Sequence, residues 1–189
     1  DVVAATELVR QYGFTVGHQL MPGLPGEDWD SLVRTTDAIC RLQPDLARIY
    51  PVAVLTGTDL ADSWRAGCYH ALTIHEGVVR AAYMKQRLLE QGINCIRTGL
   101  QATEDLDDDT QVLAGAYTPA MGELVDTRRY GRQLLSFLRS LPAGPGITIC
   151  YNRRDTSRVR GYRNVTVKTA RWSLPYRLTW RQDEVPVGH

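Results

Sequence analysis

The order of expected elements in the first half of the chain limits the fold more than any other feature. Helical patterns alternate there with apolar runs that are typical of strands. One helical pattern follows Asp28. A second begins at a Thr-x-x-Glu capping box, residues 73–76, and stops at Gly92. Strands separated by helices pair in parallel through right-handed crossovers. The sequence therefore predicts an α/β fold, as an open layer or as part of a (β/α) barrel. The expected strands are residues 14–20, 46–55 and 94–100.

Small and flexible residues follow all three expected strands. The segments read HQLMPGLPG, YPVAVLTGT and IRTGLQATE. Parallel α/β sheets bind ligands beyond the carboxyl ends of their strands, and glycine lets the backbone approach a ligand closely. We therefore expect the three segments to lie side by side as the rim of a binding site, although tight βα turns would use the same residue types. No G-x-G-x-x-G or Walker lysine occurs, which argues against dinucleotide and P-loop sites.

A second region is expected after the acidic run EDLDDD. Thr118 and Pro119 have the pattern of a helix start, and helical periodicity continues to Leu141. After this helix we expect the turn PAGPG and the strand ITICYN. They are followed by the basic turn RRDTSRVRGYRN, which has room for a short helix, and by the strand YRLTW. We therefore divide the chain into an α/β part, residues 1–103, and a small α+β region, residues 104–189.

The charge of the chain is unevenly distributed. The net charge is only +1, but residues 151–189 carry nine Lys and Arg against three acids. Aromatic residues are interleaved with these cations, a composition that suits RNA because guanidinium groups bind phosphates and rings stack on bases. Strands with one solvated arginine face would have the same composition. The expected RNA-contacting residues are Arg153, Arg154, Arg158, Arg160 and Arg163.

The cysteine and histidine spacing predicts no metal site. The four cysteines are far apart and form no C-x-x-C pair, so we expect buried, reduced thiols in a cytoplasmic protein. His18, His70 and His75 could in principle join Cys68, but their spacing matches no standard zinc site. No apolar run approaches the ~20 residues that cross a bilayer, so no membrane partner is expected.

Four blocks of the chain, in order, resemble the later half of a radical S-adenosylmethionine (SAM) enzyme. They read GHQLMPGLPGE, PDLARIYPVAVLTGTDLADSWRAGCY, IRTGLQATE and AGAYTPAMGELV. The chain is similar to bacterial proteins related to the catalytic subunit of elongator, and the Gly-Leu-Pro strand is shared with coproporphyrinogen oxidase-like enzymes. The resemblance covers residues 1–130, and the basic region after it matches more loosely.

The resemblance implies a cofactor pair that this chain does not complete. Such enzymes hold a [4Fe–4S] cluster in a C-x-x-x-C-x-x-C loop, and the cluster cleaves SAM reductively. That loop is absent, and widely spaced cysteines cannot replace it. We expect SAM and the cluster to bind the parent protein, with the missing N-terminal half of the barrel as this chain's partner. No cofactor is expected to bind tightly here, and the chain alone is expected to be inactive.

The resemblance also implies residue roles. Gln19 and Met21 lie where related enzymes contact the ribose or methionine part and the adenine of SAM, Ala53 lies where backbone meets the adenine edge, and Gly23 and Pro25 shape the rim. Substrate contacts are expected from Arg48, Tyr50, Arg97 and Gln101, because an arginine in a strand is costly unless it is paired or faces a wet cavity. Salt bridges to Glu104 or Asp105 are the alternative.

Two further expectations concern function and assembly. Elongator relatives act on tRNA, so tRNA is a possible substrate, but no acetyltransferase domain is visible downstream, and this departs from elongator proper. The alternative function is a basic α+β module that binds RNA or a protein without a catalytic role. Because the first strand lacks a neighbour on one side, we also expect the chain to self-associate along that edge.

Overall fold

The computed structural model describes residues 1–101, 110–142, 144 and 146–186. The chain forms two compact units, Asp1–Gly122 and Glu123–His189. The division does not coincide with the expected one at residue 103, because strand β5 (Val112–Gly115) pairs with β3 (Ala53–Leu55) of the first unit. Where the barrel half itself ends stays a prediction. Among the described residues, no helix is long and apolar enough to cross a membrane.

The first unit is built on a parallel sheet of three strands in the order β1-β2-β4. The strands are β1 (Gly17–Leu20), β2 (Leu46–Ile49) and β4 (Asn94–Thr98). The prediction of parallel, neighbouring strands is therefore confirmed for residues 17–20, 46–49 and 94–98, and the chain has an α/β fold. β1 lies at one edge, as expected, and self-association along this edge stays a prediction.

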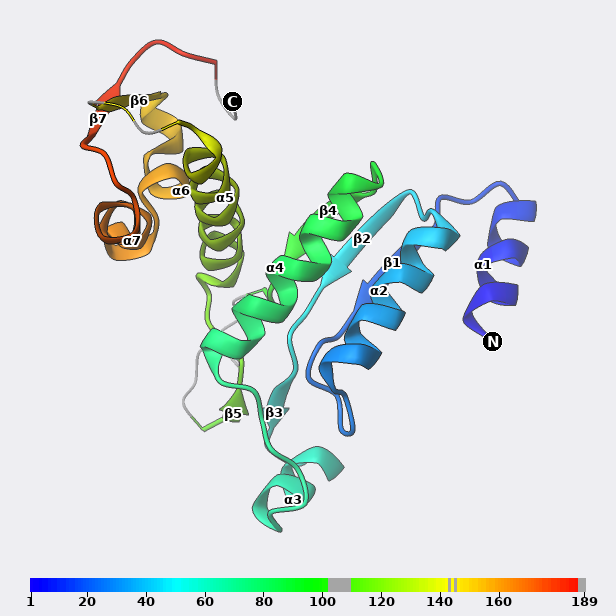
Figure 1. The fold of residues 1–189 in the computed structure, drawn as a ribbon. Coiled ribbons are helices and arrows are strands. Elements are labelled where there is room, and N and C mark those ends of the chain that lie inside the picture. Colours follow the sequence, from blue (N-terminus) through cyan, green and yellow to red (C-terminus); the bar gives the residue numbers. More distant parts are fainter. Residues whose placement is uncertain (102–109, 143, 145, 187–189) are drawn as a thin grey trace. The chain divides into compact units, whose positions relative to one another are not determined.

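Helices cover one face of this sheet. Helix α2 (Trp29–Leu42) begins at the capping box of Asp28 and Ser31, and α4 (Ile74–Glu90) at the predicted box of Thr73 and Glu76. Each helix buries one apolar stripe, in which Leu32 of α2 and Leu88 of α4 are fully buried. Figure 1 shows α2 and α4 side by side over the strands.

The prediction of one strand over residues 46–55 is wrong. Strand β2 ends at Ile49, although the Tyr50 and Val52 N–H groups still donate to the Leu20 and Pro22 carbonyls. Pro51, which has no N–H to donate, lies between β2 and β3. The chain then enters β3, which pairs antiparallel with β5 in a separate sheet. Helix α3 (Asp59–Arg65), capped by Thr58 as expected, packs on β3 with a small core of Val54, Ala61 and Tyr69. The Thr-Gly-Thr segment therefore follows β3 and not a strand of the parallel sheet.

The second unit is a strand–helix–helix–strand arrangement preceded by a helix. Helix α5 (Met121–Ser140) precedes β6 (Ile147–Tyr151), which pairs in parallel with β7 (Leu178–Gln182). The basic turn contains the expected helix as α6 (Thr156–Arg160), flanked by the 3₁₀ turns η1 (Arg153–Asp155) and η2 (Tyr162–Asn164). Helix α7 (Val165–Ser173) was not expected, since its β-branched residues disfavour a helix in isolation.

The docking of helix α1 (Val2–Gln11) on β1 predicts a pH dependence. The Thr6 hydroxyl donates to the Val2 carbonyl and lies 3.0 Å from His18 Nε2, so the neutral His18 ring donates to it. Burial, and secondarily Arg10, lowers the pKa of His18 below 6.5. The folded chain therefore binds fewer protons than the unfolded chain below that pH, and stability falls as the pH drops. Hydrogen exchange of the α1 amides should lose protection below pH 6.5, and His18→Gln should remove this trend.

Candidate functional site

The uncovered face of the parallel sheet carries a row of polar side chains. Gln19 of β1 lies in register with Arg48 of β2, and Arg48 lies in register with Arg97 of β4. All three residues are exposed, whereas their strand neighbours Leu20, Ala47 and Ile49 are buried under the helices. The structure therefore brings together one predicted SAM residue and two predicted substrate residues. A slip in the β2–β4 register beside Arg48 puts the two arginines opposite each other.

Arg48 and Arg97 together form a positively charged patch on this face of the sheet. Like charges directly opposite on neighbouring strands repel each other. Arg97 donates to the side-chain oxygen of Gln101 at 2.9 Å, and Arg48 makes no ion pair with any described residue. The alternative partners, Glu104 and Asp105, lie outside the described residues. Gln101 is exposed and Tyr50 is half-buried at the carboxyl end of β2. An anionic group would relieve the repulsion on this face.

The rim residues differ in what they contact. Met21, directly after β1, has 41% of its surface exposed, and Pro25 is exposed in the same loop. Gly23 is buried, and a Cβ there would lie 2.7 Å from Leu72, so its missing side chain makes room for protein packing and not for a ligand. Ala53 is half-buried in β3, where it pairs with Gly115. Only Met21 and Pro25 of this group are therefore exposed at the rim.

A buried polar cluster that the sequence reasoning missed fixes the rim loop. Glu27 accepts the Gly23 N–H at 2.9 Å, and Arg80 Nε of α4 lies 3.3 Å from the same carboxylate oxygen. The Tyr69 hydroxyl donates to the Gly23 carbonyl at 2.5 Å. Burial raises the pKa of Glu27, opposed by the Gly23 N–H and by Arg80. The sequence signal for this cluster was Glu27 itself, because an acidic residue directly after a Pro-Gly loop can accept hydrogen bonds that close the loop.

The cysteines of the described residues do not form a metal centre. No group of three or more His, Cys, Asp or Glu gathers in the part of the chain that the structure describes. All four cysteines are free, but only Cys40 is buried; Cys68 is exposed, and Cys95 and Cys150 are half-buried. The expectation of four buried thiols is therefore wrong for three of them. The sequence could not show this, because apolar neighbours along the chain do not fix burial in space.

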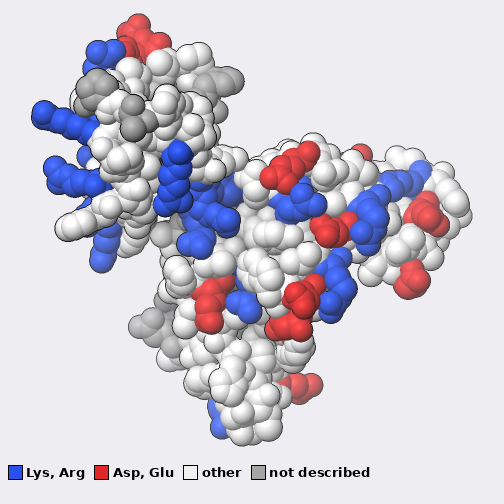
Figure 2. All heavy atoms as spheres, viewed as in Figure 1, with Lys and Arg blue, Asp and Glu red and all other residues white. Residues whose placement is uncertain are grey.

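The five predicted RNA-contacting arginines lie on one stretch of the second unit. Arg153, Arg154, Arg158 and Arg163 are exposed, and Arg160 is half-buried. Only Arg158 has a described acidic partner, Asp155, at 3.4 Å. Figure 2 shows that Lys and Arg predominate among the charged atoms on the viewed face of this unit. The structure thus presents these cations to solvent, and contact with RNA stays a prediction.

Comparison with known proteins agrees with the resemblance found in the sequence. Residues 44–130 match the Radical_SAM C-terminal domain family. Over this stretch the chain is similar to the C-terminal domain of radical SAM proteins, including elongator-type ones. A tRNA uridine(34) acetyltransferase of Methanocaldococcus jannaschii is 33% identical over 88 residues, and one of Dehalococcoides mccartyi is 40% identical over 72 residues. Those stretches cover 45% and 36% of this chain.

This chain matches only a part of these relatives. The matches cover 16% of each acetyltransferase, so this chain spans a small share of the curated relatives it matches. Protein YhcC of Escherichia coli is 28% identical over 79 residues, 42% of this chain and 26% of YhcC. The structure of Methanocaldococcus infernus Elp3 with an N-terminal deletion matches with a TM-score of 0.58 at 24% identity, over 70% of this chain and 30% of that one. This structural likeness supports the α/β fold.

Proposed function

We propose that the first unit is the second half of a partial radical SAM barrel and that its uncovered sheet face lines the reaction cavity of the parent protein. One observation carries this proposal: Gln19, Arg48 and Arg97 form a cross-strand row on the face that the helices leave free. In β/α barrels, helices cover the outside of the strands and active sites lie at the carboxyl ends of the strands. A sheet face that carries polar and charged side chains is expected to line a solvated cavity for a charged ligand, because such side chains are costly to bury in an apolar core.

The residues present fit SAM as one wall of its site. Met21 offers an exposed apolar surface for a flat purine, and Gln19 offers an amide beside it. When bound with its cluster, SAM supplies the radical chemistry of such enzymes. Pro25 shapes the rim, and Ala53 meets the adenine edge through its backbone. The Glu27–Arg80–Tyr69 cluster holds Gly23 and so fixes the loop that carries Met21.

The residues present do not fit the iron–sulfur cluster. A [4Fe–4S] cluster takes cysteine thiolates, and the described cysteines do not gather. We propose that the cluster is held by the N-terminal half of the parent barrel, which supplies the C-x-x-x-C-x-x-C loop.

We propose an anionic substrate, with tRNA as the first candidate. Arg48 and Arg97 lie in register, and Arg97 is oriented by Gln101, so the pair presents donors to a phosphate or carboxylate at the carboxyl end of the sheet. Tyr50 adds a ring at the same end of β2. The relatives named as tRNA uridine(34) acetyltransferases support tRNA as the class of substrate. We do not extend this proposal to acetyl transfer.

The test requires the full-length parent protein, purified anaerobically. We expect bound iron and sulfide, and release of 5′-deoxyadenosine from SAM in the presence of a reductant. The 189-residue chain alone should release none, because it lacks the cluster loop. A full-length protein that binds neither iron nor SAM would overturn the proposal and would favour the second candidate, a basic module that binds RNA or protein without catalysis.

A further inference from the structure

The second unit contains a pocket that the radical chemistry does not use. It has a volume of about 670 Å³, within the ~300–1,000 Å³ range of small-ligand sites. It lies between helix α7 and strand β7, and the C-terminal residue of α6 closes one side. Its walls are Arg160, Val167, Arg171, Tyr176, Arg177, Leu178, Thr179 and Trp180.

Three arginines and no acidic residue line this pocket. Arg160 is held in place, because it donates to the side-chain oxygen of Asn164 at 2.9 Å and to the Tyr151 hydroxyl at 3.3 Å. Arg171 and Arg177 are exposed and make no ion pair with any residue that the structure describes. The pocket is therefore a concentration of positive charge that its own lining does not neutralise, and it favours an anionic occupant.

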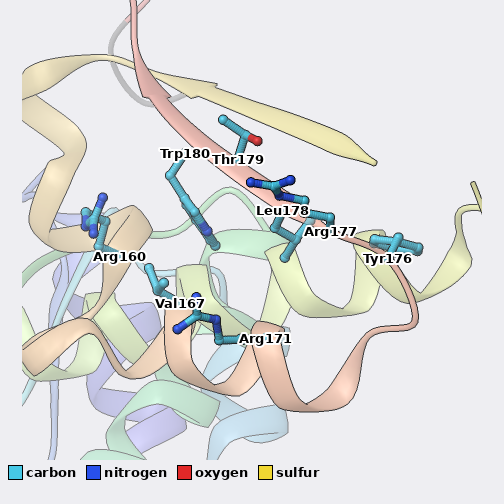
Figure 3. A pocket seen from close by; sticks show the side chains of 8 residues that line it. All are labelled: Arg160, Val167, Arg171, Tyr176, Arg177, Leu178, Thr179 and Trp180. Carbon is cyan, nitrogen blue, oxygen red and sulfur yellow. The ribbon is translucent and has the colours of Figure 1, made fainter. Parts of the chain in front are cut away.

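The pocket also has an apolar, aromatic part of its lining, formed by Val167, Leu178 and Trp180. Figure 3 shows Trp180 directed from β7 toward Val167 and Arg171 of α7. Leu178 lies two residues earlier on β7, on the same side of the strand as Trp180, and both are half-buried. A half-buried indole beside arginines can stack a base while the guanidinium groups bind its phosphates. An acidic peptide or a simple phosphate would use the arginines but not this aromatic surface.

The loop beside the pocket supports a chain of nucleotides and not a single one. Residues 161–164 read Gly-Tyr-Arg-Asn, and Gly161, Arg163 and Asn164 all have positive φ. A Cβ at Gly161 would lie 2.7 Å from Thr166 Oγ1, so glycine is required there. A Gly-x-x-Gly loop clamps the backbone of single-stranded RNA in KH modules. In this loop Asn164 stands at the position of the second glycine. Apart from glycine, asparagine is among the residues that best tolerate the left-handed backbone conformation found there. The exposed Arg163 and Tyr162 extend the surface beyond the pocket.

We propose that the pocket between α7 and β7 binds single-stranded RNA, with an unstacked base on Trp180 and neighbouring phosphates on Arg160, Arg171 and Arg177. The site is independent of the SAM chemistry. The choice of RNA over DNA rests on the tRNA substrate proposed above. Because Arg153, Arg154 and Arg158 lie outside the pocket lining, they contact only flanking phosphates.

Binding is tested with the 189-residue chain and a fluorescein-labelled, single-stranded RNA oligonucleotide of mixed sequence. Anisotropy gives Kd over a series of salt concentrations, with the same sequence as single-stranded DNA and as duplex RNA in parallel. The variant Arg171→Gln/Arg177→Gln should bind at least about tenfold more weakly, and its salt slope should fall by about 1.4, because each lost phosphate contact removes ~0.7. Trp180→Leu should also weaken binding about tenfold, through lost stacking, but should keep the salt slope.

The matched control removes the same charge elsewhere in the unit. Arg132→Gln/Arg139→Gln changes two exposed arginines of α5 that do not line the pocket, and it should shift Kd by less than the pocket pair. Circular dichroism confirms that each variant is folded. Equal losses in both double variants, an unchanged Kd for Trp180→Leu, or tighter binding of the duplex would overturn the proposal. Tighter binding of DNA would overturn the choice of RNA, and no binding at micromolar protein would overturn the proposal. Because no step requires SAM, a negative result leaves the catalytic proposal standing.

Discussion

Replacing Arg48 by Met in the full-length parent protein should lower kcat/KM about 100-fold without destabilising the fold. Arg48 is exposed on the uncovered sheet face and makes no ion pair with any described residue, so its loss breaks no described structural contact. Two charge-assisted hydrogen bonds to a ligand anion contribute about 1.5–3 kcal/mol each, which corresponds to at least a 100-fold change in total. Removing one of two facing positive charges should raise stability by up to ~1 kcal/mol. The measurements are SAM-dependent turnover and denaturant unfolding of the same sample.

Arg34→Met is the matched control for this variant. Arg34 is an exposed arginine of α2, away from the polar row, and its loss should leave turnover within about twofold, as expected for a surface change that touches no ligand. Lower stability with unchanged turnover for Arg48→Met would mean that Arg48 pairs with the acidic run, as in the alternative with Glu104 or Asp105. The cavity assignment would then be wrong for this residue.

Gly115→Ala should cost about 3 kcal/mol or more, the largest stability loss we expect from one added methyl group in the first unit. Gly115 has φ +107, and a Cβ there would lie 2.6 Å from the Val52 carbonyl oxygen and 2.9 Å from Ala53 Cα. Both contacts are with backbone, which cannot move aside as a flexible side chain could. The β3–β5 pairing should open, and hydrogen exchange of residues 53–55 and 112–115 measures this directly.

Gly57→Ala separates backbone strain from steric overlap. Gly57 also has a positive φ, +75, but no atom lies within 4 Å of a Cβ at that position. This variant should therefore cost only about 1 kcal/mol, the penalty for a left-handed alanine. Equal costs for the two variants would show that the close approach of Gly115 to the Val52 carbonyl does not contribute.

Local patterns predicted the elements whose causes are local. The capping box at Thr73 and Glu76, the cap at Asp28 and the stop at Gly92 depend on hydrogen bonds and backbone angles within one turn, so their positions could be read directly. The parallel pairing of the three segments also followed, because helices between strands leave few other connections. The resemblance to radical SAM proteins came from four such blocks in order.

Features that depend on distant contacts could not be predicted. Residues 46–55 have one continuous apolar pattern, yet β2 ends at Ile49 because the following backbone leaves to pair with β5, far along the chain. Helix α7 forms because Thr166 and Ala170 pack in the second unit, which its helix propensity does not show. Nor did the sequence show that a Cβ at Gly23 would lie 2.7 Å from the Leu72 side chain.

By itself, the sequence determined the alternation of strands and helices, the helix caps and the uneven charge, because these are set by neighbours along the chain. The tertiary structure alone decided that Gln19, Arg48 and Arg97 share one row, and that Trp180 lies against α7 beside three arginines. Register and packing join residues that are distant in sequence, and one residue of slip in a strand moves every side chain to the other face.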